Sequence, residues 1–205
     1  TANPSMPQSG RTAGNGRLGA LVQASHTTGD ALAVQQFLYQ MGTEQAEILA
    51  LEASSHGLDQ QRLQGMPVTV AIYTNLSRDH LDYHADMAEY AAAKAKLFDK
   101  AHFPNLTHAI INIDDEHAQV MLEMANASGL TVWTYSLDSS KAATFVAADI
   151  TPSLQGVQIN LRTDFGDDKA DNIEIASPLL GRFNVANLLA AIAAVVALDV
   201  DLAIN

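Results

Sequence analysis

Short apolar runs alternate with longer segments of helical periodicity along much of the chain, and this alternation constrains the fold more than any other feature. A strand, a helix and a second strand in succession place the two strands parallel, with the helix on a face of the sheet. The sequence therefore predicts a largely parallel sheet covered by helices. The expected strands are residues 46–54, 68–77, 108–114 and 130–137, and the expected helices are residues 29–42, 86–98 and 115–129.

The texture of the sequence changes after residue 143. Residues 144–164 and 171–179 combine strand-forming residues with turn signals, so we expect a small antiparallel element there. Residues 184–199, NVANLLAAIAAVVALD, predict one strongly apolar helix. The predicted fold class is α/β, a mostly parallel sheet flanked by helices with a small antiparallel β element.

Composition narrows the class of function. The chain has 205 residues, 48% of them hydrophobic, which is enough for a substantial core. It contains no cysteine, so disulfides and thiolate metal sites are excluded. The formal net charge of −12 argues against a nucleic-acid partner, because phosphate binding needs clustered Lys and Arg. No signal peptide or membrane-spanning run is evident, so we expect a cytoplasmic protein without membrane insertion.

One lysine stands on the apolar side of the helix expected over residues 86–98. Asp86 followed three residues later by Glu89 is a capping-box pattern that marks the start of this helix. Lys94 falls within the apolar stripe of the helix, where a charged ammonium is costly to bury. On spacing alone, a lysine in this position is best explained by snorkelling, with its stem buried and its amine in water. The stripe comprises Met87, Tyr90, Ala91, Leu97 and Phe98.

A metal site offers a second explanation for Lys94. In open parallel sheets ligands gather at the carboxyl ends of strands, where Glu52, Asp79 and His80 are expected. A carboxylate and an imidazole without thiols favour Mg²⁺ or Mn²⁺. A buried, neutral lysine amine can react with carbon dioxide to give an anionic carbamate, which would turn Lys94 into a metal ligand. The alternatives remain a helix cap for Glu52, a turn residue for Asp79 and an ordinary partly buried histidine for His80.

Two polar segments suit the binding of phosphate or sugar oxygens. Residues 54–62, SSHGLDQQR, place hydroxyls, an amide and Arg62 in a loop after an expected strand. Residues 25–30, SHTTGD, place hydroxyl and imidazole groups before a helix. Side chains of these types and helix-end amides can hold anions. An exposed turn in the first segment and a helix N-cap in the second are equally good explanations.

Taken together, four motifs resemble the central domain of the Mur ligases. They are EASSHGLDQQRLQG, TNLSRDHLDYHADMAEYAAAKAKLF, AIINIDDE and GRFNVANLLAA, in that order along the chain. The resemblance runs from about GNGRLG to the last helix, and we assign residues 1–205 to one P-loop-NTPase-like central domain. The folylpolyglutamate synthases share the general plan, but the SSHGLxQxR and DHLDYH patterns favour the muramyl branch.

The resemblance implies a chemistry for the family. Mur ligases form amide bonds with ATP and Mg²⁺ during the synthesis of peptidoglycan precursors. In the branch indicated here, a carboxylate of UDP-N-acetylmuramoyl (UDP-MurNAc)-L-Ala-D-Glu attacks the γ-phosphate of ATP. The amine of a diamino acid, meso-diaminopimelate or L-lysine, then attacks the acyl phosphate and becomes the third residue of the peptide. Metal ions and positioned cations stabilise the charge that moves during phosphoryl transfer.

The matching motifs also assign residues. Lys94 corresponds to the family's carbamylated lysine, and Glu52 and His80 correspond to its magnesium ligands; Lys94 and His80 are the catalytic candidates. Asn184 and Asn187 match positions near the nucleotide base, with helix capping as an open alternative. The residues that match positions for the UDP-MurNAc-dipeptide are His26, Thr27, Thr28, Ser54, Gln60 and Arg62.

The sequence departs from the family pattern in one important respect. It contains no Gly-Lys dipeptide, so the phosphate-binding loop G-x-x-x-x-G-K-[ST] is missing. We expect a central domain truncated on its P-loop side, without the family's N-terminal and C-terminal domains. A non-catalytic substrate-binding remnant of the fold and a folylpolyglutamate-type ligase are the alternatives. The choice of diamino acid and the oligomeric state are left open by the sequence.

A missing phosphate-binding loop predicts that this chain alone does not catalyse ATP-dependent ligation. The measurement is ADP release in the presence of UDP-MurNAc-L-Ala-D-Glu, diaminopimelate, ATP and Mg²⁺, with a reaction lacking diaminopimelate as the control. We expect no release above that control. Robust turnover would refute the prediction.

Overall fold

The computed structural model describes residues 28–77, 83–166 and 171–199. The chain divides into two compact units. Residues 1–66 and 81–97 form the first unit, and residues 67–80 and 98–205 form the second.

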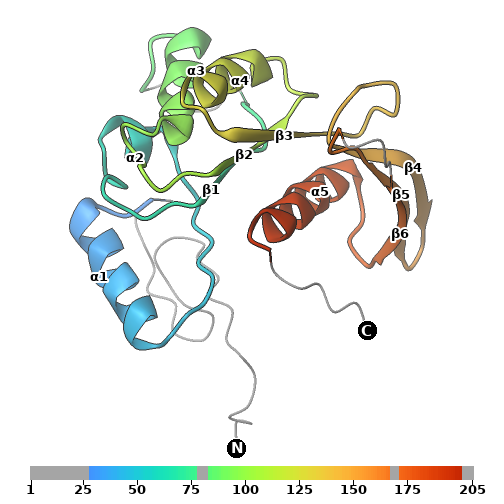
Figure 1. Cartoon of the computed structure of the whole chain (residues 1–205), viewed down its shortest axis with the longest axis horizontal. Coiled ribbons are helices and arrows are strands. Elements are labelled where there is room, and N and C mark those ends of the chain that lie inside the picture. The colour runs from blue at the N-terminus through green and yellow to red at the C-terminus, as the bar shows by residue number, and fades with distance from the viewer. Residues whose placement is uncertain (1–27, 78–82, 167–170, 200–205) are drawn as a thin grey trace, which may run out of the picture. The chain divides into compact units, whose positions relative to one another are not determined.

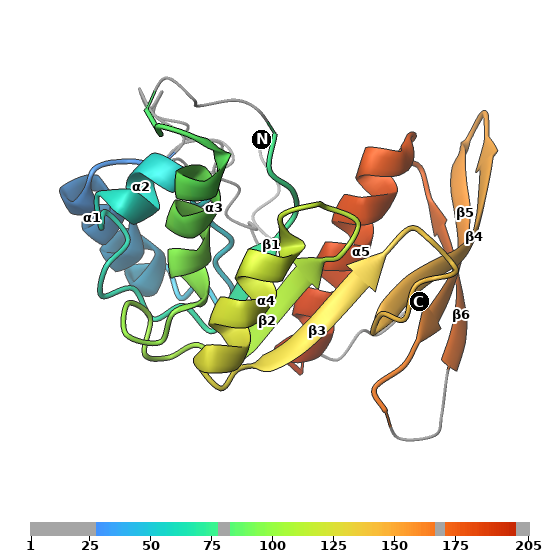
Figure 2. The same ribbon diagram turned by 90° about the horizontal axis from the view of Figure 1, so that it is seen from above.

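The second unit contains a six-stranded sheet in the order β1-β2-β3-β4-β5-β6 (Figures 1 and 2). Strands β1 to β4 pair in parallel, whereas the β4–β5 and β5–β6 pairs are antiparallel. The prediction of a mostly parallel sheet with a small antiparallel element is therefore confirmed. The strands are β1 (Val70–Tyr73), β2 (His108–Asn112), β3 (Thr131–Ser136), β4 (Phe145–Ser153), β5 (Gly156–Thr163) and β6 (Asp171–Ser177).

Helices cover both faces of this sheet. Figures 1 and 2 show α5 (Arg182–Ala197) against one face and α4 (Ala118–Ala127) against the other. The buried side of α5 presents Leu189 and Ala193 to a core that includes Phe145, Ile159 and Leu161 from β4 and β5. Each fully buried large apolar side chain of this kind contributes about 1.5–3 kcal/mol. This core therefore joins the parallel and antiparallel parts of the sheet.

The described part of the first unit is helical. Helix α1 (Ala31–Thr43) begins at Asp30, whose side chain accepts a hydrogen bond from the Ala33 N–H at 2.8 Å. The N-cap interpretation of residues 25–30 is thus correct for Asp30. Helix α3 (Met87–Ala95) continues into the short 3-10 helix η1 (Lys96–Phe98).

The start of α3 agrees with the predicted capping pattern and refines it. The Asp86 carboxylate accepts from the Glu89 N–H at 2.8 Å, as an N-cap does. The Glu89 carboxylate reaches back to the Ala85 N–H at 2.7 Å, one residue before the cap. The two side chains together satisfy donors that a helix start leaves without partners.

Two expectations for the first unit are wrong. Residues 46–54 form no strand, and residues 55–59 form the short helix α2 (Ser55–Asp59) instead of a loop. The side chain of Ser54, and not that of Glu52, caps α2 by accepting from the Gly57 N–H at 3.1 Å. Side chains, rather than a neighbouring strand, bond the backbone groups at the end of this run, at residues 52–54.

The turn between β4 and β5 requires glycine at position 156. Gly156 has φ of +139°, and a Cβ atom there would lie far inside the van der Waals distance of the Ser177 carbonyl oxygen on β6. Gly166 also has a positive φ, +81°, but a Cβ would meet nothing within 4 Å. The two positions thus separate backbone strain from steric overlap.

We predict that Gly156→Ala lowers the free energy of unfolding by about 2–4 kcal/mol, because strain and overlap add. Gly166→Ala is the matched control and should cost about 1 kcal/mol, from strain alone. Urea unfolding followed by circular dichroism measures both. Equal losses in the two variants would show that the β6 carbonyl moves aside without cost.

Candidate functional site

The backbone around Glu52 is held by a side chain from far away in the sequence. The Thr28 hydroxyl donates to the Glu52 carbonyl at 3.0 Å and accepts from the Ser54 N–H at 2.9 Å. Thr28 is only 3% exposed, and its methyl carbon lies 2.7 Å from the position that a Cβ atom at Gly57 would occupy. One threonine therefore fixes the segment that carries two predicted site residues, the Glu52 carboxylate and the Ser54 hydroxyl.

Lys94 reaches the same segment from helix α3. Its Nζ donates to the Ala53 carbonyl at 3.2 Å, and the side chain is partly buried. Burial lowers the pKa of the Lys94 amine, while the negative charge of Glu52 acts in the opposite direction. The amine therefore loses its proton more readily than an ordinary surface lysine. Lys94 thus lies on the apolar side of α3 with its stem partly buried and its amine on a backbone carbonyl.

A chain of hydrogen bonds organises the other polar residues of the first unit. The Arg62 Nε and Nη2 donate to Gln60 Oε1 at 2.9 and 2.6 Å, and Nη1 donates to the Thr28 carbonyl at 2.9 Å. Gln60 Nε2 donates to the Tyr83 hydroxyl at 3.3 Å. The Tyr83 hydroxyl donates to Asp59 at 2.9 Å. Three predicted substrate residues, Thr28, Gln60 and Arg62, are thus joined by direct contacts.

Tyr83 and Asp59 take part in this chain of hydrogen bonds, although the sequence did not single them out as site residues. Tyr83 lies within the DHLDYH motif, which is the signal that could have found it. Its ring lies against His56 at 4.0 Å and edge-on to His84 at 4.8 Å, measured between ring centroids. His84 is 2% exposed and stacks on Tyr90. This aromatic packing fixes the Tyr83 ring against helix α2.

Several predicted site residues are placed elsewhere or not described. His26, Thr27 and His80 lie outside the described residues, as does Asp79. Asn184 and Asn187 belong to the second unit, at the start of α5. Neither is the N-cap, because Gly181 occupies that position without a side-chain hydrogen bond. The Asn184 amide donates instead to the Leu180 carbonyl at 2.7 Å.

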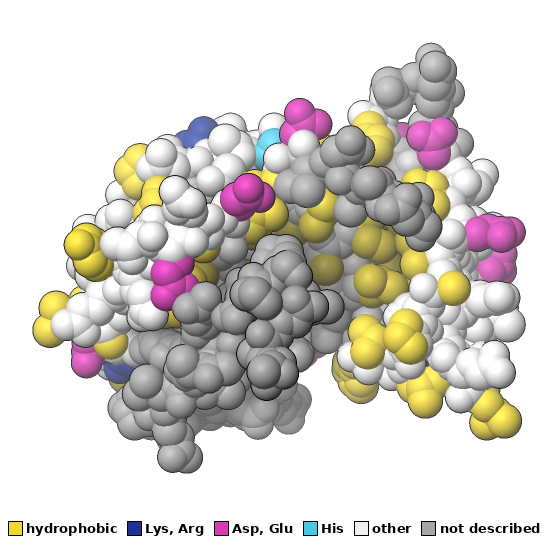
Figure 3. Space-filling view, turned by 90° about the horizontal axis from the view of Figure 1, so that it is seen from below, with side chains coloured by type: hydrophobic (Ala, Val, Ile, Leu, Met, Phe, Trp, Pro, Cys, Tyr) yellow, Lys and Arg dark blue, Asp and Glu magenta, His cyan; other side chains and the backbone are white. Residues whose placement is uncertain are grey.

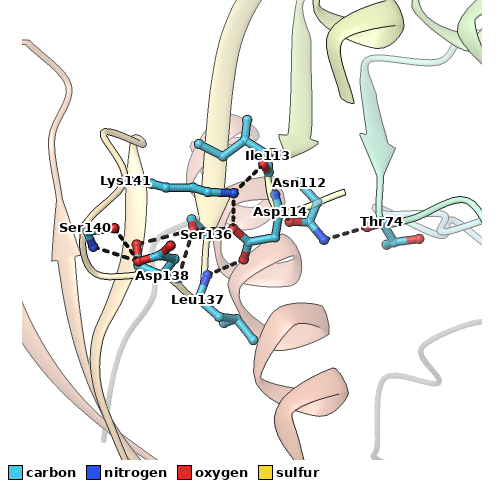
Figure 4. A network of polar contacts seen from close by, with 9 residues as sticks. All are labelled: Thr74, Asn112, Ile113, Asp114, Ser136, Leu137, Asp138, Ser140 and Lys141. Atoms are coloured by element: carbon cyan, nitrogen blue, oxygen red, sulfur yellow. Dashed lines mark hydrogen bonds and ion pairs between the residues drawn. The ribbon is translucent and has the colours of Figure 1, made fainter. Parts of the chain in front are cut away.

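The second unit has a polar network of its own at the carboxyl ends of β2 and β3 (Figure 4). The Asp114 carboxylate accepts from Ser136 Oγ at 2.6 Å, the Leu137 N–H at 2.7 Å and Lys141 Nζ at 2.9 Å. Burial opposes ionisation of Asp114, but these three donors outweigh it and lower the pKa of the carboxyl. The network therefore ties the end of β2 to the residues that follow β3.

The neighbouring carboxylate, Asp115, ties β2 to β1 at the same edge. It accepts from the Tyr73 hydroxyl at 2.6 Å and from the Leu76 N–H at 3.0 Å. Asn112 adds a hydrogen bond from its amide to the Thr74 carbonyl at 2.7 Å. Asp114 therefore bonds residues at the end of β3, and Asp115 bonds residues at the end of β1. Together they fix the loops that follow three parallel strands.

Three further facts concern the surface and the helices of the described residues. Figure 3 shows hydrophobic and acidic side chains on one face, with Lys and Arg sparse among the described residues. None of the described helices combines the length and apolar character that crossing a bilayer would require. The described large apolar side chains exposed on the second unit are Val120, Leu154, Phe165, Ile173, Leu179, Leu180, Phe183 and Val196.

This sheet belongs to the class of α/β domains that bind ligands at the carboxyl ends of parallel strands. Residues 7–195 match the Mur ligase middle domain. A relative from Neisseria meningitidis serogroup B, named UDP-N-acetylmuramoyl-L-alanyl-D-glutamate–2,6-diaminopimelate ligase, is 41% identical over 182 residues, covering 89% of this chain and 35% of that protein. A relative of the same name from Pseudomonas syringae pv. tomato is 45% identical over 189 residues, covering 92% of this chain and 36% of that protein.

Solved structures agree with these relatives. A structure of a ligase with the same name superposes with a TM-score of 0.79 at 41% identity, over 96% of this chain and 37% of that chain. A folylpolyglutamate synthase from Mycobacterium tuberculosis has a TM-score of 0.52 at 24% identity, over 66% of this chain and 28% of that chain, which shows a shared fold alone. The chain belongs to the Mur ligase family and corresponds to its middle domain. It spans little more than a third of the length of the named ligases.

The Asp114 network predicts a pH dependence of stability. Because the pKa of Asp114 is lowered on folding, its contribution is complete above the unfolded pKa of about 3.9 and is lost as the pH falls below it. At pH 7, Asp114→Asn should lower the free energy of unfolding by about 1–2 kcal/mol. The difference from the wild type should shrink as the pH falls from about 5 to about 3.

Asp149→Asn, which changes an exposed carboxyl on β4, is the matched control for Asp114→Asn. Urea titrations of both variants from pH 7 to pH 3 show whether the loss belongs to Asp114 or follows the removal of any carboxyl from the sheet. A constant difference between Asp114→Asn and the wild type from pH 7 to pH 3 would mean that the charge of Asp114 contributes nothing.

Proposed function

We propose that this chain is the middle domain of a ligase that joins diaminopimelate to UDP-MurNAc-L-Ala-D-Glu at the expense of ATP. The named relatives carry this substrate pair in their names, which favours diaminopimelate over lysine and over a folate substrate. The observation that carries the proposal is the contact between the Lys94 amine and the backbone beside Glu52. We assign the reaction to the cytoplasm, where ATP is available.

The residues present suit a magnesium ion. Glu52 is an exposed carboxylate on a segment fixed by Thr28, and its charge acts on the Lys94 amine. Carboxylate oxygens are the ligands that Mg²⁺ prefers. We therefore assign Glu52, His80 and carbamylated Lys94 as the residues that would hold it. When bound, Mg²⁺ neutralises charge on the phosphates during phosphoryl transfer.

The carbamate requires a neutral amine, which the lowered pKa of Lys94 favours. The lone pair of Nζ forms a bond to the carbon of CO₂, one carbon–oxygen π bond breaks, and its electrons become the carboxylate charge. The nitrogen then releases one proton to water. The product keeps one N–H, so the bond to the Ala53 carbonyl can persist while the new carboxylate faces away from it. Lys94 thereby changes from a cation to an anion without losing its anchor.

The remaining residues divide between direct and supporting roles. We assign Ser54, Gln60 and Arg62, together with His26 and Thr27, to the UDP-MurNAc-dipeptide. Thr28 acts through its neighbours, because its hydroxyl is already bonded to the Glu52 carbonyl and the Ser54 N–H. Asn184 and Asn187 are assigned to the nucleotide base; Asn187 is exposed, and Phe183 beside Asn184 is 84% exposed.

Carbamylation of Lys94 is tested with ¹³C-labelled bicarbonate. We expect a carbamate carbon signal in the wild-type chain at pH 8 with Mg²⁺ present, and its loss in Lys94→Gln, because the Lys94 amine combines a lowered pKa with the proposed metal site beside Glu52. Lys96→Gln, two residues further along at the start of η1, is the matched control and should keep the signal. Acidification should remove the signal as the free amine becomes protonated.

Two results would contradict the assignment of Lys94. One is a spectrum without a carbamate signal in the wild type at saturating bicarbonate and Mg²⁺. The other is a signal that survives in Lys94→Gln. Either result would return Lys94 to the role of a partly buried lysine that simply bonds a backbone carbonyl.

A further inference from the structure

The hydrogen bonds that end at Asp59 have only one consistent direction. Arg62 has donors and no acceptor, so the atom of Gln60 that faces it must be the oxygen. The Gln60 nitrogen then faces Tyr83. Asp59 as a carboxylate has only acceptors, so the Tyr83 proton must point to it, which leaves a lone pair for Gln60. Each group donates to the next, from the guanidinium to the carboxylate.

Asp59, at the end of this chain of hydrogen bonds, is held in its charged form. Lys96 Nζ lies 2.6 Å from the second oxygen of Asp59. The hydrogen bond from Lys96 and then that from Tyr83 lower the pKa of Asp59. Both side chains of the ion pair are more than a third exposed, at 35% and 38%, so the pair itself adds little stability. Its effect is to keep Asp59 an acceptor for the Tyr83 proton.

The guanidinium end retains donors for a ligand. Within the described residues, Arg62 uses its Nε–H and one N–H on each terminal nitrogen. Among the contacts with described residues, one N–H on each terminal nitrogen is unused, in the plane that the Gln60 oxygen and the Thr28 carbonyl define. A planar pair of donors suits a carboxylate or phosphate oxygen.

We propose that Tyr83 is a positioning residue that fixes the amide of Gln60 and thereby aims the two remaining N–H groups of Arg62 at an anionic group of the UDP-linked substrate. The proposal rests on the proposed function for the identity of the ligand. The hydroxyl of Tyr83 acts by receiving the Gln60 nitrogen, and the ring is held by His56 and His84.

The first measurement needs no ligand. Exchange of the Arg62 Nε–H with water, followed by ¹⁵N-resolved nuclear magnetic resonance on the whole chain, reports whether Gln60 holds the guanidinium. Tyr83→Phe keeps the ring and removes the hydroxyl, and we expect exchange to become about fivefold to tenfold faster. Tyr39→Phe, at a position 77% exposed on α1, is the matched control and should leave the rate unchanged. Unchanged exchange in folded Tyr83→Phe would overturn the proposal.

A second variant separates positioning from general loosening of the structure. In Gln60→Glu both outer atoms are oxygens, so the side chain faces Arg62 with an acceptor whichever way it turns. In that background Tyr83→Phe should change the exchange rate less than twofold. A fivefold or larger acceleration in both backgrounds would show that Tyr83 only supports local packing, and would refute the proposed role.

Binding of UDP-MurNAc-L-Ala-D-Glu, measured by titration calorimetry, tests the ligand side. We expect Tyr83→Phe to raise Kd about fivefold to tenfold and Arg62→Ala to raise it at least as much, with Tyr39→Phe unchanged. If Arg62→Ala bound the substrate more weakly while Tyr83→Phe kept the wild-type Kd, the proposal would be overturned and the proposed function would stand. Equal binding by wild type and Arg62→Ala would refute the substrate role of Arg62, and the exchange rates alone would then decide whether Tyr83 positions Gln60.

Discussion

The hydroxyl of Thr28 is the interaction on which the first unit depends most. It bonds the backbone on both sides of Ala53, at the Glu52 carbonyl and the Ser54 N–H, and so replaces the neighbouring strand that this apolar segment lacks. Both hydrogen bonds are partly buried, and a backbone group that loses its partner away from water costs free energy, so one side chain that satisfies two groups stabilises the segment. The segment then starts α2 through Ser54 and accepts Lys94 at Ala53.

Much of the fold follows from local patterns. The apolar runs at β1, β2 and β3 and the antiparallel texture after residue 143 were sufficient to predict the sheet, because period and turn signals are local properties. The run at 46–54 shows the limit of this reasoning. An apolar segment can be extended without joining a sheet, and whether it does depends on partners such as Thr28, which lies 26 residues before Ser54. Sequence periodicity carries no information on such a contact.

The candidate site was also predictable only where a local pattern marked its residues. Lys94 stood out because it interrupts an apolar stripe, and the structure shows a partly buried amine bonded to the backbone next to Glu52. Thr28, Gln60 and Arg62 were singled out as ligand contacts, but their contacts with one another could not be seen in the sequence. Asp59 and Tyr83 escaped notice because a surface carboxylate and a half-exposed tyrosine are ordinary residues until their partners are known.

Because the strand direction reverses after β4, the connections of the second unit lie at two opposite ends of the sheet. The chain leaves β1, β2 and β3 at the edge where Asp114 and Asp115 anchor the loops, whereas β5 runs back and delivers its connection to β6 at the opposite edge. Additional residues between β5 and β6 would therefore lengthen the domain at the edge remote from those two carboxylates. The β5–β6 connection is therefore a suitable site for inserting additional sequence.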